Sequence, residues 1–206
     1  MTASAQIANR VRGLKWAARN LAMDLRFGGS LAGTLPARTP GTADVVNSQY
    51  SVLPYVFADR IGSRDVLVDI GCGKGRVINW WLSQGLRNRM VGIEHNPDVA
   101  SATAHRLRRF GNVTVVNEDV TSWMPEDATV GYMYSPFGLE IMARFKQRVA
   151  RRYAGRRFTL LYWNPQFVEV FLGDPRFDTE VIDLPSGMDP RLRGMHRRFA
   201  VVRLSA

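Results

Sequence analysis

Three glycines at alternate positions form the stretch of this sequence best suited to hold a ligand. Gly71, Gly73 and Gly75 follow the apolar stretch 66–70 and precede the helix-like stretch 77–82. Glycine lets the backbone approach a bound molecule and take positive φ. The first turn of a helix has free N–H groups that face such a molecule. Strand, glycine turn and helix in this order predict a site for a nucleotide-like ligand.

The carboxylate before this turn narrows the kind of ligand. A dinucleotide fingerprint reads Gly-x-Gly-x-x-Gly, whereas here Arg76 stands at the sixth position and Asp69 precedes the first glycine. A carboxylate at the end of the strand repels a pyrophosphate and suits a ligand that carries an ammonium group. Nicotinamide-dependent dehydrogenases are therefore the weakest candidates.

Acidic residues also end the next two apolar stretches. Glu94, followed by His95, ends the second stretch, and Asp119 follows the third. Because ligands lie beyond the carboxyl ends of the strands in an open α/β sheet, these side chains are expected at one edge. Glu94 is suited to a ribose diol and Asp119 to an adenine amine. Each alone also fits a structural role, as a solvated strand end or an Asx turn, but their common order favours a ligand.

These motifs resemble those of class I, seven-stranded methyltransferases, which bind S-adenosylmethionine (SAM). The resemblance covers about residues 45–170 and is carried by Val-Asp-Ile-Gly-Cys-Gly-Lys-Gly-Arg from residue 68, Val-Gly-Ile-Glu-His-Asn-Pro from residue 91 and Asn-Glu-Asp from residue 117. It implies SAM as the cofactor, with the methionine ammonium at Asp69 and the adenine beside His95. The full cofactor set that it implies is Asp69, Gly71, Gly73, Gly75, Glu94, His95 and Asp119.

The end of the fourth strand bears on the methyl acceptor. The chain is most similar to small bacterial members of the superfamily whose fourth strand ends in Tyr-Asn-Pro-Phe, but Ser135 replaces the Asn before Pro136 and Phe137. In amine methyltransferases with a related motif, an Asn or Asp oxygen and a backbone carbonyl accept the amine hydrogens. The resemblance thus implies a catalytic role for Ser135, Pro136 and Phe137, with Asn164 as a source of the missing amide. Phe137 is suited to stack on a flat or cationic substrate; the alternative is that Pro136 and Phe137 only shape the turn.

Three further residues are candidates for the substrate site or its lid. Asn47 and Tyr50 follow the Gly- and Pro-rich stretch 28–44, which is long enough to form a lid; they resemble the entry to the first strand in such enzymes. His196 borders the loop 185–195 and is the candidate base for a hydroxyl acceptor.

Apolar spacing predicts the elements that position these residues. Strands are expected at 66–70, 89–94, 112–117, 129–134, 157–163, 177–184 and 196–204. Helices are expected at 5–27, 51–61, 77–84, 97–110, 139–153 and 166–172. This alternation predicts an α/β fold, a Rossmann-like doubly wound sheet that is mostly parallel with a C-terminal antiparallel hairpin. Residues 1–50 are expected to form an N-terminal helix and a lid-like loop, and 51–206 the SAM-binding domain of one globular unit.

Composition limits the class of protein. The chain has 206 residues, 46% of them hydrophobic, which fits one globular domain with a sizeable core. No apolar run approaches the ~20 residues that span a bilayer, and no secretory signal is recognised, so a cytoplasmic location is expected. Cys72 is the only cysteine. It excludes an internal disulfide and a cysteine-based zinc site, and we expect no metal.

The net charge of +10 leaves the partners open. The helix expected at 5–27 has apolar residues at three-or-four spacing and five basic residues. It fits either packing on its own domain with a solvated basic face, which we favour, or peripheral contact with a membrane surface. Arginine clusters within 106–109, 144–157 and 191–198 suit RNA if they converge around the cofactor.

Methyl transfer to nitrogen is the leading function. A protein side chain or a small amine is a strong nucleophile and needs little beyond in-line positioning. The alternatives are an RNA methyltransferase that uses the Arg-rich surface, and a non-catalytic SAM-binding or membrane-associated module.

Overall fold

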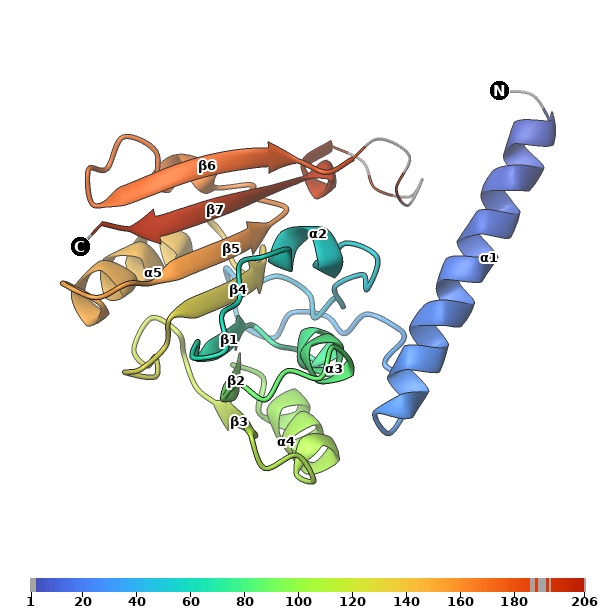
Figure 1. Ribbon diagram of the computed structural model, residues 1–206, viewed down its shortest axis with the longest axis horizontal. Helices are drawn as coiled ribbons and strands as arrows, with labels where there is room; N and C mark the ends of the chain where they lie inside the picture. Colours follow the sequence, from blue (N-terminus) through green and yellow to red (C-terminus); the bar gives the residue numbers. More distant parts are fainter. Residues whose placement is uncertain (1–2, 186–187, 189–191, 193, 206) are drawn as a thin grey trace.

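Seven strands form one sheet in the computed structural model of this chain, in the order β3-β2-β1-β4-β5-β7-β6 (Figure 1). The structure describes residues 3–185, 188, 192 and 194–205, with the backbone alone for 3–10 and 12. The strands are β1 (Leu67–Ile70), β2 (Met90–Glu94), β3 (Val113–Asn117), β4 (Val130–Tyr134), β5 (Thr159–Trp163), β6 (Phe177–Asp183) and β7 (Arg198–Leu204). β1 to β5 are parallel, and β7 pairs antiparallel with β5 and β6. This confirms the predicted fold class.

The helices largely follow the prediction. They are α1 (Ala3–Arg26), α2 (Leu53–Phe57), α3 (Arg76–Ser83), α4 (Pro97–Leu107) and α5 (Leu139–Arg152), with 3-10 turns η1 (Val168–Val170) and η2 (Gly194–Arg197). Two expected helices are shorter than predicted. α2 follows Val52, lacks a side-chain cap from Ser51 and ends at Phe57. The stretch 166–172 forms only η1, because so short a segment gains few helical hydrogen bonds for its ordering cost.

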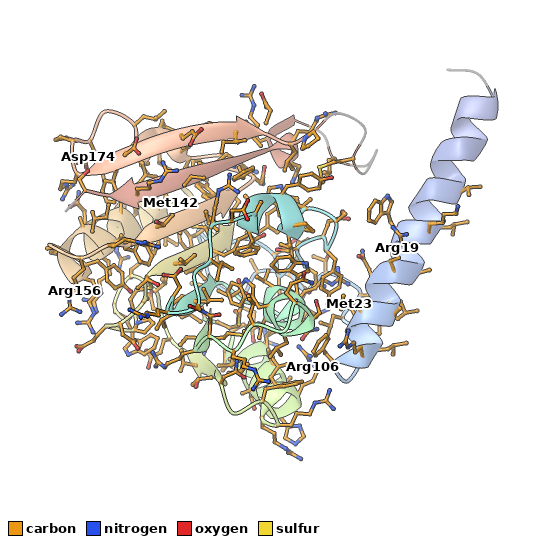
Figure 2. All side chains as sticks on the ribbon, viewed as in Figure 1. Arg19, Met23, Arg106, Met142, Arg156 and Asp174 are labelled. Carbon is orange, nitrogen blue, oxygen red and sulfur yellow. The ribbon has the colours of Figure 1, made fainter. Side chains whose placement is uncertain are left out.

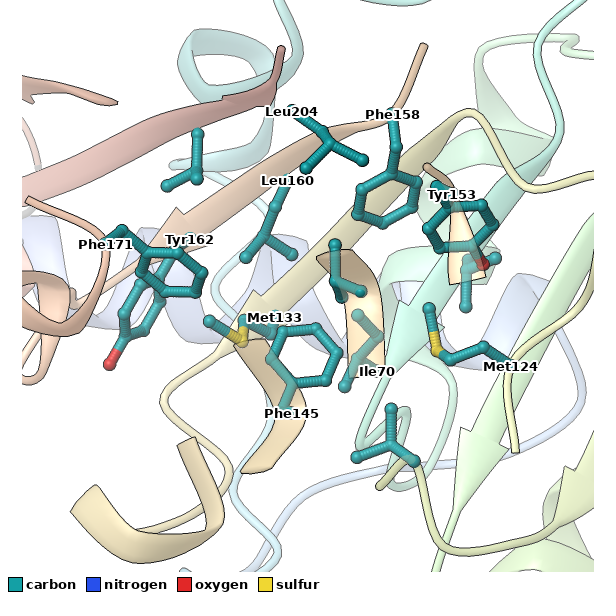
Figure 3. Packing of buried hydrophobic residues seen from close by; sticks show 14 of the residues in the cluster. Ile70, Met124, Met133, Phe145, Tyr153, Phe158, Leu160, Tyr162, Phe171 and Leu204 are labelled. Atoms are coloured by element: carbon teal, nitrogen blue, oxygen red, sulfur yellow. The ribbon is translucent and has the colours of Figure 1, made fainter. Parts of the chain in front are cut away.

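Helices cover both faces of the sheet. One apolar cluster joins β1, β4 and β5 to α5 (Figure 3), where Ile70, Met133 and Leu160 lie near Phe145. The other cluster joins the opposite face to α2 and α3. All four residues of β1 are buried, as expected for a parallel strand covered on both faces. The two covered faces leave the carboxyl ends of the parallel strands as the place for a site.

Helix α1 stands apart from the sheet and approaches the domain only near its C-terminal end, beside α3 (Figure 1). Asp24 is buried there and Met23, Asn20 and Trp16 are partly buried, whereas Leu14 is 71% exposed. The favoured expectation that the apolar stripe of this helix packs on its own domain is therefore wrong. Within the described part of the chain, no helix is both long enough and apolar enough to span a membrane.

Candidate active site

A cavity of about 620 Å³ lies at the carboxyl ends of β1, β2 and β4. Its walls are the glycine turn after β1, the residues after β2 and β3, and the turn between β4 and α5. The stretch 36–48 closes another side. This stretch is fastened to the β4–α5 turn, because the Ala43 N–H donates to the Pro136 carbonyl and the Gly138 N–H to the Gly41 carbonyl. The cavity volume of about 620 Å³ is that of a small-molecule site.

The glycine turn has the geometry that the sequence predicts. Gly71 and Gly75 have φ of 69° and 73°, a region that favours glycine. A Cβ on Gly71 would come within 2.8 Å of the Pro136 side chain, so the two turns that line the cavity touch at this position. The N–H groups of Gly71 and Cys72 both donate to the Ile93 carbonyl at 2.9 Å, which fixes the turn on β2. Gly75 then begins α3 as its N-cap.

Glu94 joins the end of β2 to this turn. One carboxylate oxygen accepts from the Gly73 N–H at 2.8 Å, and the other accepts from the Asn96 N–H at 2.8 Å. The side chain is 6% exposed and lines the cavity. Each carboxylate oxygen can accept a further hydrogen bond. Glu94 thus has a structural role that the sequence did not reveal, and it keeps the capacity to accept from a ligand diol.

Asp69 is the group in the cavity wall that most clearly lacks a partner. It is 2% exposed, and its Oδ2 has no hydrogen bond among the described residues. Burial, together with the nearby charge of Glu94, raises the pKa of Asp69 well above its usual value. A buried carboxylate oxygen normally has a donor, and a cationic ligand group would supply one. This observation fits the ammonium-bearing cofactor implied by the sequence.

Replacement of Asp69 by Asn should give a pH-dependent gain in stability. Because the folded-state pKa of Asp69 is raised, its ionisation costs stability as pH rises above the ordinary carboxyl value of about 3.9. The Asp69→Asn variant escapes this cost, so its free energy of unfolding relative to wild type should increase from pH 4 to pH 8 in urea titrations. Asp119→Asn is the control: because the pKa of Asp119 is lowered, its ionisation contributes stability that is lost only as pH falls below the ordinary carboxyl value, so its difference from wild type should stay nearly constant from pH 4 to pH 8. If the difference in the free energy of unfolding between Asp69→Asn and wild type did not change with pH, the raised pKa of Asp69 would be contradicted.

Asp119 and His95 both line the cavity at the ends of β3 and β2. Asp119 Oδ1 accepts from the Thr121 N–H at 2.8 Å, which is the Asx turn that the sequence left open. Although burial alone would raise it, this bond and the nearby charges of His95 and Arg144 hold the pKa of Asp119 below its usual value. Asp119 therefore stays ionised and able to accept from a ligand amine, and His95 is exposed at the rim.

The four candidate catalytic residues fall into two groups. Pro136 and Phe137 line the cavity, whereas Ser135 and Asn164 are not among its lining residues. Burial raises the pKa of Tyr162, and the nearby Ser135 side chain acts in the opposite direction. Asn164 is buried, and its Oδ1 has no partner in the described part of the chain. Ser135 and Asn164 have φ of 40° and 53°, a region that costs a non-glycine residue roughly 1–2 kcal/mol.

The two candidate lid residues also differ in position. Asn47 lines the cavity, and its side-chain amide donates to the Leu31 carbonyl. Tyr50 is 8% exposed, belongs to the core and donates through its hydroxyl to Asp24 at 2.9 Å. Burial raises the pKa of this phenol. The structure therefore gives Tyr50 a packing role away from the cavity.

His196 reaches the cavity only through Tyr134. The Tyr134 hydroxyl lies 3.2 Å from His196 Nδ1, and the Tyr134 ring stacks on Trp163 with centroids 4.1 Å apart. The Trp163 indole N–H donates to the His196 carbonyl at 2.9 Å. Tyr134 lines the cavity whereas His196 does not. Tyr134 is thus a wall residue that the sequence analysis missed, although it directly precedes the Ser-Pro-Phe motif. Of the loop next to His196, residues 186–187, 189–191 and 193 lie outside the described residues.

Arg76 and Asp24 form a buried pair that the sequence analysis also missed. The guanidinium binds both carboxylate oxygens, with distances of 3.0 and 2.6 Å. Lys74 adds to this anchor by donating to the carbonyls of the stretch 31–33. Arg76, which stands where the dinucleotide fingerprint has glycine, therefore holds the N-terminal segment against the glycine turn.

The basic clusters lie largely away from the cavity. Of their described members only Arg144 lines it. Arg106 (Figure 2) has a structural role, because its guanidinium donates to the backbone carbonyls of Phe27 and Lys74. Arg191 and Arg193 lie outside the described residues. The described clusters thus give the RNA alternative little geometric support.

A sequence model of the protein family described as "Methyltransferase domain" matches residues 67–156. The match spans β1 to the residues just after α5 and includes the glycine turn, Glu94 and Asp119. The methyltransferase class that the sequence predicts is thereby confirmed. A search of curated proteins finds no match.

Solved structures similar to this chain include three methyltransferases. The glycopeptide N-methyltransferase MtfA, in complex with S-adenosylhomocysteine (SAH), superposes with a TM-score of 0.59 at 14% identity over 76% of this chain and 90% of that chain. An rRNA methylase from Streptococcus thermophilus superposes with a TM-score of 0.53 at 14% identity, over 78% of this chain and 98% of that chain. The mitomycin 7-O-methyltransferase MmcR superposes with a TM-score of 0.56 at 16% identity, over 76% of this chain and 53% of that chain. These likenesses confirm the fold. The three proteins are named as an N-methyltransferase, an rRNA methylase and an O-methyltransferase, so the fold alone does not determine the acceptor.

Proposed function

We propose that this chain, whose residues 67–156 match a methyltransferase domain, uses SAM as the methyl donor and a nitrogen of a protein side chain or small amine as the acceptor. The observation that carries the donor assignment is the unpartnered, buried Oδ2 of Asp69 in the cavity wall. Beside it, Glu94 has spare acceptor capacity for a diol. The two carboxylates match an ammonium and a ribose on one ligand.

The chain's own residues would bind and orient this donor. SAM, when bound, supplies a methyl group on a positively charged sulfur, and a strong nucleophile attacks it in line. Glu94 would accept from the ribose hydroxyls, and Asp69 would accept from the ammonium. Asp119 would accept from the adenine amine, and His95 would flank the ring. Gly71 lines the cavity and lets the backbone approach the donor without a side chain between them, whereas Gly75 makes room for the side chains of Thr103 and Arg106 on α4.

The acceptor end of the cavity supports nitrogen over oxygen. Among the described residues that line the cavity the only histidine is His95, which lies at the end assigned to adenine. A hydroxyl acceptor needs a base, whereas a neutral amine needs mainly positioning. The ring faces of Tyr134 and Phe137 suit an amine that arrives as a cation, and the exposed Glu140 adds a carboxylate to the cavity lining. Such an amine would lose its proton to solvent before its lone pair attacks the methyl group.

Ser135 and Asn164 fit positioning roles in this proposal. Their positive φ values occur at the ends of two adjacent strands, β4 and β5. Ser135 lies in the turn that presents Pro136 and Phe137, and its side chain is near Tyr162 on the adjacent strand β5. Such backbone strain persists where the surrounding structure enforces it, often near functional sites.

Methyl transfer from radiolabelled SAM should distinguish nitrogen from oxygen acceptors. The purified chain is incubated with peptides rich in Lys, Arg or His, with small amines, with their hydroxyl analogues and with total RNA. We expect transfer to a nitrogen compound, with a mass increase of one methyl group. Tyr134→Ala should raise the acceptor KM by about tenfold through loss of a cation–π contact, whereas Tyr134→Phe should keep it.

Each alternative has its own outcome in this assay. Transfer to hydroxyl analogues alone, with loss on His196→Ala, would replace the nitrogen proposal by an O-methyltransferase. Transfer to RNA alone would favour the RNA alternative. Binding of SAM in calorimetry without any transfer would favour the non-catalytic module, and no binding of SAM or SAH to folded protein would reject the donor itself.

A further inference from the structure

The outward face of α1 is an apolar stripe without a partner in the described structure. With 3.6 residues per turn, the residues of α1 that lie toward the domain form one face, which includes Met23 (Figure 2). The apolar stripe lies on roughly the opposite face. Its exposed members are Val11 (47%), Leu14 (71%), Ala18, Leu21 (44%) and Leu25 (57%).

The sequence of α1 is rich in basic residues and almost free of acidic ones. From residue 3 to residue 23 the helix carries Arg10, Arg12, Lys15 and Arg19, and no Asp or Glu. Asp24 is the only acidic residue of α1, and it is buried against Arg76 at 2.6 Å. The exposed length of the helix is therefore cationic as well as apolar.

The root of α1 is held firmly at the glycine turn. Besides the Asp24–Arg76 pair, Arg106 donates to the Phe27 carbonyl at 2.7 Å, and the Leu31 N–H donates to Asp24 at 3.3 Å. These bonds fix the direction in which α1 leaves the domain (Figure 1). The helix is thus an anchored projection, and its outward stripe is available to a large surface.

We propose that α1 lies on an anionic lipid bilayer. Leu14 and Leu21 would enter the boundary between headgroups and acyl chains, and Lys15 would contact lipid phosphates. Arg19, whose guanidinium lies 5.5 Å from the centroid of the Trp16 ring, would turn outward to do the same. A second copy of α1 fits less well, because a helix pair along this stripe would bring cationic residues together without acidic partners. RNA fits less well, because it would leave the leucines in water.

Flotation of the full chain with lipid vesicles tests this proposal. The vesicles are pure phosphatidylcholine or phosphatidylcholine with one quarter phosphatidylglycerol. We expect flotation with the anionic vesicles only, weakening as salt rises. Leu14→Ser/Leu21→Ser and Lys15→Glu/Arg19→Glu should each lower partition by on the order of tenfold or more. Leu172→Ser and Arg87→Glu, exposed sites outside α1, are the matched controls and should float like wild type.

Several outcomes would overturn the proposal. These are flotation that is absent, that is equal on neutral vesicles, or that survives both α1 double variants. A dimer in sedimentation that Leu14→Ser/Leu21→Ser dissociates, without flotation, would assign the stripe to a second copy. RNA binding that survives the leucine variant would assign the charge to RNA. Circular dichroism melting of each variant checks the fold, and SAM calorimetry, which α1 variants should not change, keeps this test separate from the proposed function.

Discussion

Glu94→Ala should lower the affinity for SAM and SAH by about 100-fold or more. Hydrogen bonds to a charged group contribute roughly 1.5–3 kcal/mol each, and Glu94 is assigned two, to a ligand diol. The substitution also frees the N–H groups of Gly73 and Asn96, which Glu94 holds at 2.8 Å. The cavity would thus lose a ligand contact and part of its shape at once.

Isothermal calorimetry with SAM and SAH measures this loss. Glu118→Ala removes an exposed carboxylate that does not line the cavity, so its affinity should stay within about twofold of wild type. Thermal melting of both variants shows whether the fold is kept. An unchanged affinity in folded Glu94→Ala would mean that the donor lies elsewhere in the molecule.

The donor side of the site was predictable because parallel strands end at one edge. Asp69 lies near the end of β1, Glu94 ends β2 and Asp119 follows β3, and the sheet order places these strands side by side. Knowing the strands was therefore enough to bring the residues together. The sequence left the Asx turn of Asp119 open, but it missed that Glu94 also binds backbone N–H groups, since such bonds depend on the local path of the chain.

The acceptor side was less predictable because side-chain direction there depends on unusual backbone angles. Ser135 and Asn164 follow strands as the donor residues do, but both have positive φ and neither lines the cavity. Tyr134, one residue earlier, lines it instead. A sequence gives strand ends to within a residue or two, and at a turn one residue changes which side chain faces the ligand.

The N-terminal helix shows a different limit. Its stripe from Val11 to Leu25 correctly predicted an amphipathic helix, because periodicity reports a face that is apolar. Periodicity does not say what covers that face. The contact that orients α1 is instead polar, between Asp24 and Arg76, which are 52 residues apart. No spacing rule links such a pair.

Loss of this pair should give the largest change in stability. Removing one partner of a buried ion pair leaves an uncompensated charge and costs about 3–5 kcal/mol. Asp24 is 1% and Arg76 9% exposed, so we expect Asp24→Ala to lower the free energy of unfolding by that amount in urea titrations. The Tyr50 hydroxyl and the Leu31 N–H would lose their acceptor as well.

Two matched variants separate the buried charge from general effects of substitution. Asp127→Ala breaks the exposed Asp127–Arg89 pair and should cost below about 1 kcal/mol. The double variant Asp24→Leu/Arg76→Met removes both charges, so it should recover most of the loss caused by Asp24→Ala. If Asp24→Ala cost no more than Asp127→Ala, the pair would not be buried in solution, and α1 would not be anchored to the glycine turn. Recovery in the double variant would instead show that this anchor acts through charge pairing at the first residue of α3, next to the turn assigned to the methyl donor.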